Sequence, residues 1–170
     1  MSMTTAAILG TGAWGTTFAQ VLADAGVDVT MWGRNADTIA FINGGENPTY
    51  LPGITLLDRI SATTEIAEAV AGRELVVVAV PVKAVRATLS AAREAFAPGV
   101  ALLSLAKGLE LGSLKRVDEI IAEASGVPEN RIAVLSGPNL SREIADRQPT
   151  ATVVAASDVE LAKAVSYTHL

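Results

Sequence analysis

Three glycines near the start of the chain have a spacing suited to binding phosphate groups. They lie in the segment Gly10-Thr11-Gly12-Ala13-Trp14-Gly15. An apolar stretch at 6–9 predicts a buried strand before it, and an amphipathic stretch at 14–25 predicts a helix after it. Gly10 would permit a tight turn, Gly12 would let the backbone approach a pyrophosphate, and Gly15 would let the helix pack on the strand. The free N–H groups and dipole of the helix would then bind a dinucleotide.

The end of the next predicted strand, residues 27–32, bears on which dinucleotide is bound. NAD-specific domains carry an acidic residue there, about 20 residues past the glycines. This chain has Trp32-Gly33-Arg34-Asn35 instead. The Arg34 guanidinium could bind a 2′-phosphate; the other interpretation is an exposed surface arginine. We therefore predict that NADPH is the preferred cofactor, with NADH as the second candidate.

Apolar and amphipathic stretches alternate along the rest of the chain. Further strands are predicted at 60–63, 75–80, 100–105, 132–135 and 151–156, and further helices at 36–43, 64–71, 85–97, 117–124, 141–145 and 159–165. Residues 47–54 contain two prolines and a glycine and predict a loop. This alternation is typical of βαβ units with right-handed crossovers. It predicts an α/β fold of the Rossmann type, doubly wound around a mostly parallel sheet.

Composition excludes several classes of function. The 170 residues are 50% hydrophobic and 18% charged, with a net charge of −5 and no cluster of Lys or Arg, which argues against nucleic acid as a partner. The absence of cysteine excludes disulfides and thiolate metal sites, and the single histidine leaves no material for a zinc site or a His-based proton relay, so we expect no metal. The longest apolar run, residues 75–82, is too short to span a membrane. With no signal-peptide pattern at the N-terminus, we expect a cytoplasmic protein.

A series of short motifs resembles one enzyme family, the bacterial NAD(P)-dependent glycerol-3-phosphate dehydrogenases. The motifs follow the family's order and are Gly10-Thr11-Gly12-Ala13-Trp14-Gly15-Thr16, Trp32-Gly33-Arg34, Asn47-Pro48-x-Tyr50-Leu51-Pro52-Gly53, Val80-Pro81, Lys107-Gly108-Leu109-Glu110, and Ser136-Gly137-Pro138-Asn139 with Glu143. The resemblance implies a reaction, the reduction of dihydroxyacetone phosphate to sn-glycerol 3-phosphate with NAD(P)H, which supplies glycerophospholipid synthesis. It also allows for a homodimer in the intact protein.

The resemblance implies roles for particular positions. The residues expected to bind the cofactor are Gly10, Gly12, Ala13, Trp14, Gly15, Arg34, Lys107 and Ser141. The residues expected to bind the substrate are Lys107, Gly137 and Asn139. Asn139 and Ser141 depart from the family's usual residues, which are often Thr or Ser at the first position and Ala at the second.

Two of these residues also have an ordinary structural interpretation. Trp14 could pack in the core, cover the cofactor, or do both. Lys107 could be a solvated surface lysine. Its place just past a predicted strand favours ligand binding, because an ammonium there could bind a phosphorylated ketone and polarise the developing alkoxide.

Members of this family are about twice as long, and a second, helical domain carries their catalytic lysine. We therefore expect no catalytic residue of that set here, and a chain that binds cofactor without turnover. Residues 1–164 would form the dinucleotide-binding domain, and residues 165–170 resemble a translated sequencing adapter, a foreign tail. Two alternatives stay open: a stand-alone dinucleotide-binding module, and the cofactor domain of a related hydroxyacid, ketopantoate or pyrroline-carboxylate reductase.

Overall fold

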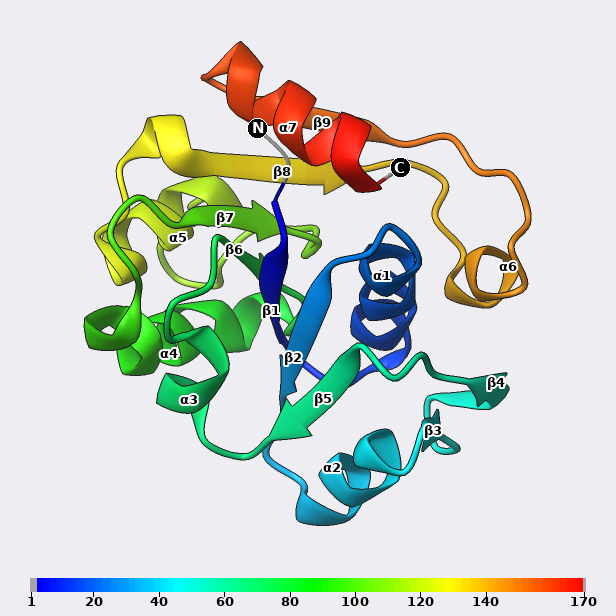
Figure 1. Cartoon of the computed structure of the whole chain (residues 1–170). Coiled ribbons are helices and arrows are strands. Elements are labelled where there is room, and N and C mark those ends of the chain that lie inside the picture. The colour runs from blue at the N-terminus through cyan, green and yellow to red at the C-terminus, as the bar shows by residue number, and fades with distance from the viewer. Residues whose placement is uncertain (1–2, 170) are drawn as a thin grey trace.

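The computed structural model describes the backbone of residues 3–169 and the side chains of residues 3–166. Strands and helices alternate along this range (Figure 1). The strands of the main sheet are β1 (Thr5–Leu9), β2 (Asp28–Trp32), β5 (Ile60–Thr63), β6 (Leu75–Val78), β7 (Ala101–Ser104), β8 (Ile132–Ser136) and β9 (Val153–Ala156). The helices are α1 (Ala13–Asp24), α2 (Ala36–Asn43), α3 (Ile66–Val70), α4 (Val82–Ala92), α5 (Val117–Ser125), α6 (Ser141–Ala145) and α7 (Val159–His169). Two short 3-10 turns, Arg93–Ala95 and Glu129–Arg131, follow α4 and precede β8.

The order of the strands confirms the predicted doubly wound fold. The sheet runs β5-β2-β1-β6-β7-β8-β9, and all neighbours pair in parallel except β8 and β9, which are antiparallel. The chain builds outward from β1 through β2 to β5, then returns to place β6 on the other side of β1. A crevice forms where the order reverses, beyond the carboxyl ends of β1 and β6, and open α/β sheets bind ligands at this point.

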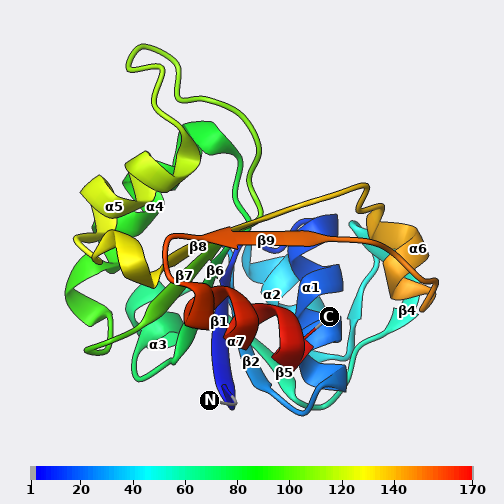
Figure 2. The same cartoon turned by 90° about the horizontal axis from the view of Figure 1, so that it is seen from above.

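Helices cover both faces of the sheet (Figures 1 and 2). One hydrophobic core contains Phe18 of α1 and Leu161 of α7, and the other contains Leu89 of α4 and Ile120 of α5. All four residues of β6 are fully buried, since their side chains alternate between these two cores. This explains why residues 75–78 form an apolar run without polar alternation.

A small hairpin replaces the loop that the sequence predicts at residues 47–54. Strand β3 (Glu46–Asn47) pairs antiparallel with β4 (Leu51–Thr55), outside the main sheet. Proline is tolerated on an edge strand because one side of such a strand needs no ladder donor. Because the segment contains Pro52 inside β4, its composition predicted a loop instead of a strand.

The helix boundaries differ most from the predicted ones in α4, which ends at Ala92 rather than at residue 97, and in α7. Helix α4 begins at Val82 rather than Val85, because Pro81 serves as its N-cap with φ −56° and ψ 146°. Helix α7 continues to His169, through the segment expected to be foreign, and Val165 in it is fully buried in the core. Leu170, the last residue of that segment, lies outside the described residues. Within the described range, no helix combines the length and apolar character needed to cross a membrane.

Candidate functional site

The glycine turn joins β1 to α1 and is closed by backbone contacts. Gly10 has φ +126°, and a Cβ there would lie 2.8 Å from the carbonyl oxygen of Ala79. A Cβ on Gly15 would lie 2.5 Å from the carbonyl oxygen of Gly10. Both distances are far below van der Waals contact, so a side chain at either position would force the turn, α1 and the segment after β6 apart. Packing therefore requires glycine at these two positions.

Gly12 is different, because it faces open space. No atom lies within 4 Å of a Cβ built at Gly12. It is the N-cap of α1, where it makes no side-chain cap bond, and the first turn of the helix contains no acidic residue. The first N–H groups of a helix have no partner inside it, and the helix dipole favours an anion at this end. The turn therefore presents open donors where a phosphate can come close to the backbone.

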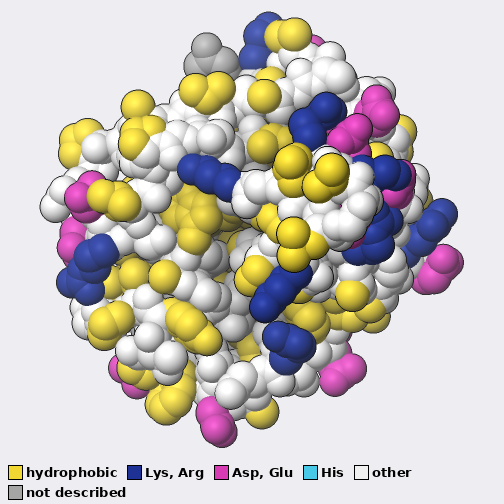
Figure 3. All heavy atoms as spheres, turned by 180° about the vertical axis from the view of Figure 1, so that it is seen from behind, with side chains coloured by type: hydrophobic (Ala, Val, Ile, Leu, Met, Phe, Trp, Pro, Cys, Tyr) yellow, Lys and Arg dark blue, Asp and Glu magenta, His cyan; other side chains and the backbone are white. Residues whose placement is uncertain are grey.

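A cavity of about 530 Å³ opens over this turn. Its lining combines the ends of four strands and one hairpin residue: Gly10, Thr11, Gly12, Trp14, Gly15, Trp32, Gly33, Arg34, Tyr50, Ala79, Val80, Pro81, Val82, Leu105, Ala106 and Lys107. Seen from behind, the surface is hollowed near its centre, with hydrophobic side chains inside and Lys and Arg side chains beside the hollow (Figure 3). The volume is within the range of small-molecule and cofactor sites. The position is the switch point of the sheet.

Arg34 stands at the rim of this cavity with its guanidinium free. It is exposed, and no hydrogen bond or ion pair among the described residues involves it. The next side chain is already engaged, since Asn35 Oδ1 accepts a 2.9 Å hydrogen bond from the Thr38 amide and so caps α2. Gly33 keeps the strand end close to the glycine turn, because a Cβ there would lie 2.7 Å from Thr11 Cγ2. The end of β2 thus places the Arg34 guanidinium at the cavity without a partner among the described residues.

Lys107 links the cavity to the end of β8. Its side chain is exposed and lines the cavity, and its Nζ donates a 2.9 Å hydrogen bond to the carbonyl oxygen of Gly137. Packing requires glycine at this position, since Gly137 has φ +154° and a Cβ on it would lie 2.7 Å from the Ala151 oxygen. An ammonium has three N–H donors. One orients Lys107 and the other two are available to a ligand.

The remaining predicted positions, Ala13, Asn139 and Ser141, do not line the cavity. Asn139 is half-buried; its Nδ2 is 3.5 Å from Thr152 Oγ1, and its Oδ1 is buried with no partner among the described residues. Ser141 begins α6, and its carbonyl oxygen accepts a 3.1 Å hydrogen bond from Thr17 Oγ1 on α1. Ala13 is the first residue of α1. The structure therefore gathers Gly10, Gly12, Trp14, Gly15, Arg34 and Lys107 around one cavity, with Gly137 attached through Lys107.

Trp14 takes part in both the core and the cavity. Its ring meets that of Phe18 edge to face, with centroids 5.8 Å apart and planes at 70°. It packs against the core while lining the cavity. Both interpretations drawn from the sequence are therefore compatible with its position.

Two parts of the lining received no role from the sequence. The segment after β6, Val80–Val82, follows a buried strand just as the glycine turn does, so its place at a carboxyl end was a usable signal. Tyr50 comes from the hairpin, is 48% exposed and stands at the cavity. Nothing local predicts its position, because that depends on how the hairpin folds back toward the main sheet.

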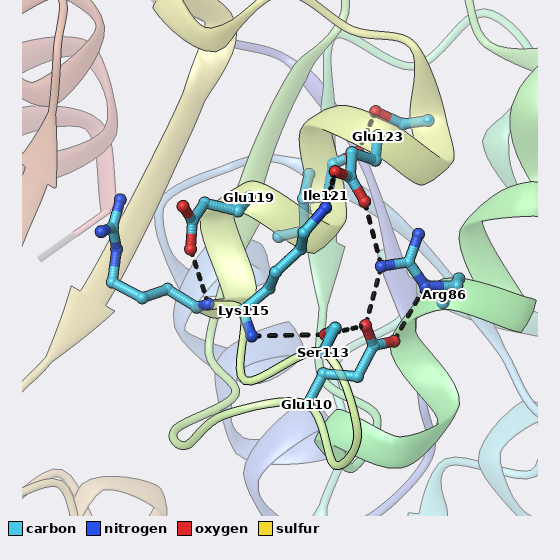
Figure 4. A network of polar contacts seen from close by, with 9 residues as sticks. Arg86, Glu110, Ser113, Lys115, Glu119, Ile121 and Glu123 are labelled. Carbon is cyan, nitrogen blue, oxygen red and sulfur yellow. Dashed lines mark hydrogen bonds and ion pairs between the residues drawn. The ribbon is translucent and has the colours of Figure 1, made fainter.

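An ion-pair network holds the loop of residues 106–116, which follows β7 and projects from the body (Figures 2 and 4). Arg86 of α4 donates to both carboxylate oxygens of Glu110, at 2.8 and 2.7 Å, and to Glu123 of α5 at 3.1 Å. Hydrogen bonds from Arg86 and from the Ser113 hydroxyl lower the pKa of Glu110 to about 2. The loop that contains Lys107 is thus tied to both helices on that face of the sheet.

Comparison with known proteins agrees with this arrangement. The family described as NAD-dependent glycerol-3-phosphate dehydrogenase N-terminus matches residues 5–162. Proteins named glycerol-3-phosphate dehydrogenase (NAD(P)+) from Thermobifida fusca and Streptomyces griseus are 52% and 49% identical over 162 and 159 residues, covering 94% and 93% of this chain. A glycerol-3-phosphate dehydrogenase structure from Coxiella burnetii has a TM-score of 0.91 and 28% identity, over 99% of this chain and 51% of that one.

The match covers only part of each relative. It covers 48% of the Thermobifida fusca protein and 47% of the Streptomyces griseus protein, so the chain spans about half the length of the curated relatives it matches. On the side of this chain, the family match extends from the start of β1 into α7 and includes the whole cavity. The chain therefore belongs to the NAD-dependent glycerol-3-phosphate dehydrogenase family, to whose N-terminal part residues 5–162 correspond.

Proposed function

We propose that this chain binds NADPH in preference to NADH and forms the dinucleotide-binding part of an enzyme that interconverts dihydroxyacetone phosphate and sn-glycerol 3-phosphate. The observation that carries the proposal is the single cavity at the switch point of the sheet, around which the glycine turn, Arg34 and Lys107 gather. The names of the relatives support the class of cofactor and the substrate.

The residues at the cavity suit a phosphorylated dinucleotide. The open side of Gly12 and the first turn of α1 suit the pyrophosphate, because they combine free donors with room for close approach. Arg34 suits a 2′-phosphate, since a guanidinium can bind two of its oxygens at once. No Asp or Glu occurs among the described residues that line the cavity, so no carboxylate there opposes either phosphate.

Lys107 suits the substrate side of the same cavity. A bound nicotinamide would supply the hydride. The part we assign to Lys107 is to attract the phosphorylated ketone and to place N–H donors toward its oxygens. Its bond to the Gly137 oxygen fixes the direction of the side chain, and Asn139 two residues later adds a polar group near the same strand end. This chain would thus bind and orient both reactants.

A titration with matched arginine variants tests the cofactor proposal. Fluorescence titration should show tighter binding of NADPH than of NADH. Arg34→Gln should weaken NADPH binding by about 5- to 30-fold, the equivalent of losing a charged hydrogen bond worth roughly 1–2 kcal/mol at an exposed site. Its effect on NADH should be under twofold. Arg59→Gln is the control, because Arg59 is exposed, pairs with Asp28 and lies outside the cavity lining. Equal affinity for the two cofactors would contradict the preference.

A chimera tests the substrate. Residues 1–162 would be joined to the part of the Thermobifida fusca relative that lies beyond its match with this chain. We expect oxidation of NADPH that depends on dihydroxyacetone phosphate, and a loss of about 100-fold or more in kcat/KM in the Lys107→Ala version. The Arg59→Gln version is again the control. A folded, NADPH-binding chimera without this activity would refute the substrate, and near-normal turnover of Lys107→Ala would refute the role of Lys107.

A further inference from the structure

One buried amide connects the hairpin to the glycine turn. Asn47 of β3 is 1% exposed. Its Nδ2 donates hydrogen bonds to the Thr11 carbonyl oxygen at 3.0 Å and to Thr16 Oγ1 at 2.8 Å. The Thr16 hydroxyl donates in turn to the same Thr11 oxygen at 3.3 Å. A residue from a separate hairpin therefore holds both the start of the turn and the first turn of α1.

The bond to Thr11 fixes the orientation of a peptide group in the turn. A trans peptide is planar, and its C=O and N–H point in opposite directions. Because the Thr11 oxygen is held toward Asn47, the N–H of Gly12 must point away from the hairpin. Gly12 and Thr11 both line the cavity. The hairpin contact thus determines the direction of one of the donors that we assign to the pyrophosphate.

At this position the side-chain amide must donate hydrogen bonds, whereas its acceptor oxygen has no partner among the described residues. The Thr11 carbonyl can only accept, so the Asn47 NH₂ group must face it. The other end of the amide, Asn47 Oδ1, is buried with no hydrogen-bond partner among the described residues. An unpaired buried acceptor is unfavourable. The contribution of this amide therefore consists of its two donated hydrogen bonds, one to the glycine turn and one to the first turn of α1.

The same hairpin also brings an aromatic side chain to the cavity. The Tyr50 amide donates a 3.3 Å hydrogen bond to the Asn47 carbonyl oxygen, and Asn47 is paired with Leu51 across the hairpin. Tyr50 stands at the cavity with nearly half of its surface exposed. The backbone of Asn47 thus places Tyr50 while its side chain places the turn.

We propose that Asn47 is a positioning residue, which holds the glycine turn in the conformation that receives the dinucleotide pyrophosphate. The proposal rests on the proposed function of the cavity. It assigns no contact between Asn47 and the cofactor, since Asn47 acts through Thr11 and Thr16. Removing the amide should therefore weaken the binding of ligands that carry a pyrophosphate and leave the binding of other ligands unchanged.

The test compares two ligands and three variants of the 170-residue chain by calorimetric titration. NADPH carries both the pyrophosphate and the 2′-phosphate, whereas adenosine 2′-phosphate carries only the latter. Asn47→Ala should weaken NADPH binding about tenfold, as expected for two lost hydrogen bonds, and adenosine 2′-phosphate binding less than twofold. Asn47→Asp keeps the shape but turns the donor into an acceptor facing the Thr11 oxygen, so its loss with NADPH should be at least as large.

Asn43→Ala is the matched control. Asn43 also makes two hydrogen bonds, from Nδ2 to the Ala62 oxygen at 2.9 Å and from the Ala62 amide to Oδ1 at 2.8 Å, but they join α2 to β5 and do not touch the turn. This variant should lower the unfolding temperature while changing the affinity for each ligand by less than twofold. If Asn47→Ala does not fold, Thr16→Val replaces it, because it removes one acceptor of the Asn47 amide while keeping the hairpin intact. It should produce the same selective loss, smaller in size.

The outcomes separate the two proposals. A selective loss with NADPH in the Asn47 variants supports the positioning role. An equal loss with both ligands, or no loss with either, overturns that role and leaves the proposed function standing. If the unmodified chain binds neither ligand, the proposed function is refuted and the positioning role with it.

Discussion

Replacing Gly15 by alanine should destabilise the fold, although the same change in most helices stabilises it. Alanine is favoured over glycine inside a helix by about 1 kcal/mol. Here the new Cβ would lie 2.5 Å from the Gly10 oxygen and 3.2 Å from the Ala79 Cβ. Ordinary contacts are about 3.5–4.0 Å, so α1 would have to move by roughly 1 Å from the sheet.

The neighbours of Gly15 cannot easily give way. The Gly10 amide is bonded to the Trp32 oxygen at 2.9 Å, and Ala79 continues from a fully buried strand. Overpacking of this kind is unfavourable by about 1–3 kcal/mol. Because the shortest contact is with the Gly10 backbone and the Ala79 Cβ is fixed by its own backbone, we take an overpacking cost of about 2–3 kcal/mol and subtract the gain in helix propensity. The free energy of unfolding of Gly15→Ala should fall by about 1–2 kcal/mol in urea denaturation.

Gly12→Ala is the control within the same turn. Gly12 has φ −70° and nothing within 4 Å of its Cβ position, so the unfolding free energy should change by less than about 1 kcal/mol. Its Cβ would instead occupy the space assigned to the pyrophosphate, weakening NADPH binding by about 5- to 150-fold. A Gly15→Ala variant as stable as the unmodified chain would refute the packing argument. A Gly12→Ala variant as unstable as Gly15→Ala would show that Gly12 does not face open space.

Three further predictions concern the core, the loop after β7 and the end of β8. Leu89→Ala, at a fully buried position of α4, should lower the unfolding free energy by about 2–5 kcal/mol in urea denaturation. Lys83→Ala, on the exposed side of the same helix, should change it by under about 0.5 kcal/mol, and equal effects would contradict the assigned core. Because Arg86 and Ser113 lower the pKa of Glu110 to about 2, its charge should stabilise the fold fully above the ordinary pKa of 4.5. That contribution should disappear as the pH falls toward 2, so thermal unfolding between pH 2 and 6 should depend less on pH in Glu110→Gln; identical profiles would refute the pairing. Gly137→Ala would place a Cβ 2.7 Å from the Ala151 oxygen at φ +154°, and should displace the carbonyl that binds Lys107. The unfolding temperature of Gly137→Ala should fall, while that of Lys107→Ala should stay within about 2 °C of the unmodified chain. A larger fall in Lys107→Ala than in Gly137→Ala would contradict the geometry.

The periodicity of the chain was enough to predict the layers and the central strands. Residues 75–78 are apolar without alternation because both sides of β6 are covered, and that pattern is visible in the sequence. The ends of the helices were harder to predict. The strand predicted at 75–80 ends at Val78, and Pro81 serves instead as the N-cap of α4, because its fixed φ suits that position.

The site was predictable where its residues directly follow strand ends. The three glycines and Arg34 follow consecutive strand ends, so the spacing alone placed them at one edge of the sheet. Asn47 and Tyr50 could not be placed in this way. They belong to a hairpin concealed by Pro52, and the bond from Asn47 to Thr11 spans 36 residues. Such a contact depends on tertiary packing, which local propensity does not encode.

The order in which the cavity residues occur has a consequence for synthesis on the ribosome. Every residue that lines the cavity lies between positions 10 and 107. Translation at about 5–20 residues per second leaves on the order of several seconds between Lys107 and the completion of β9. All residues that line the cavity are therefore synthesised before β8, whereas the hydrogen bond of Lys107 must wait for Gly137 to be made. A dinucleotide that binds during this interval would stabilise the half-made sheet by mass action and so assist the folding of its own binding site.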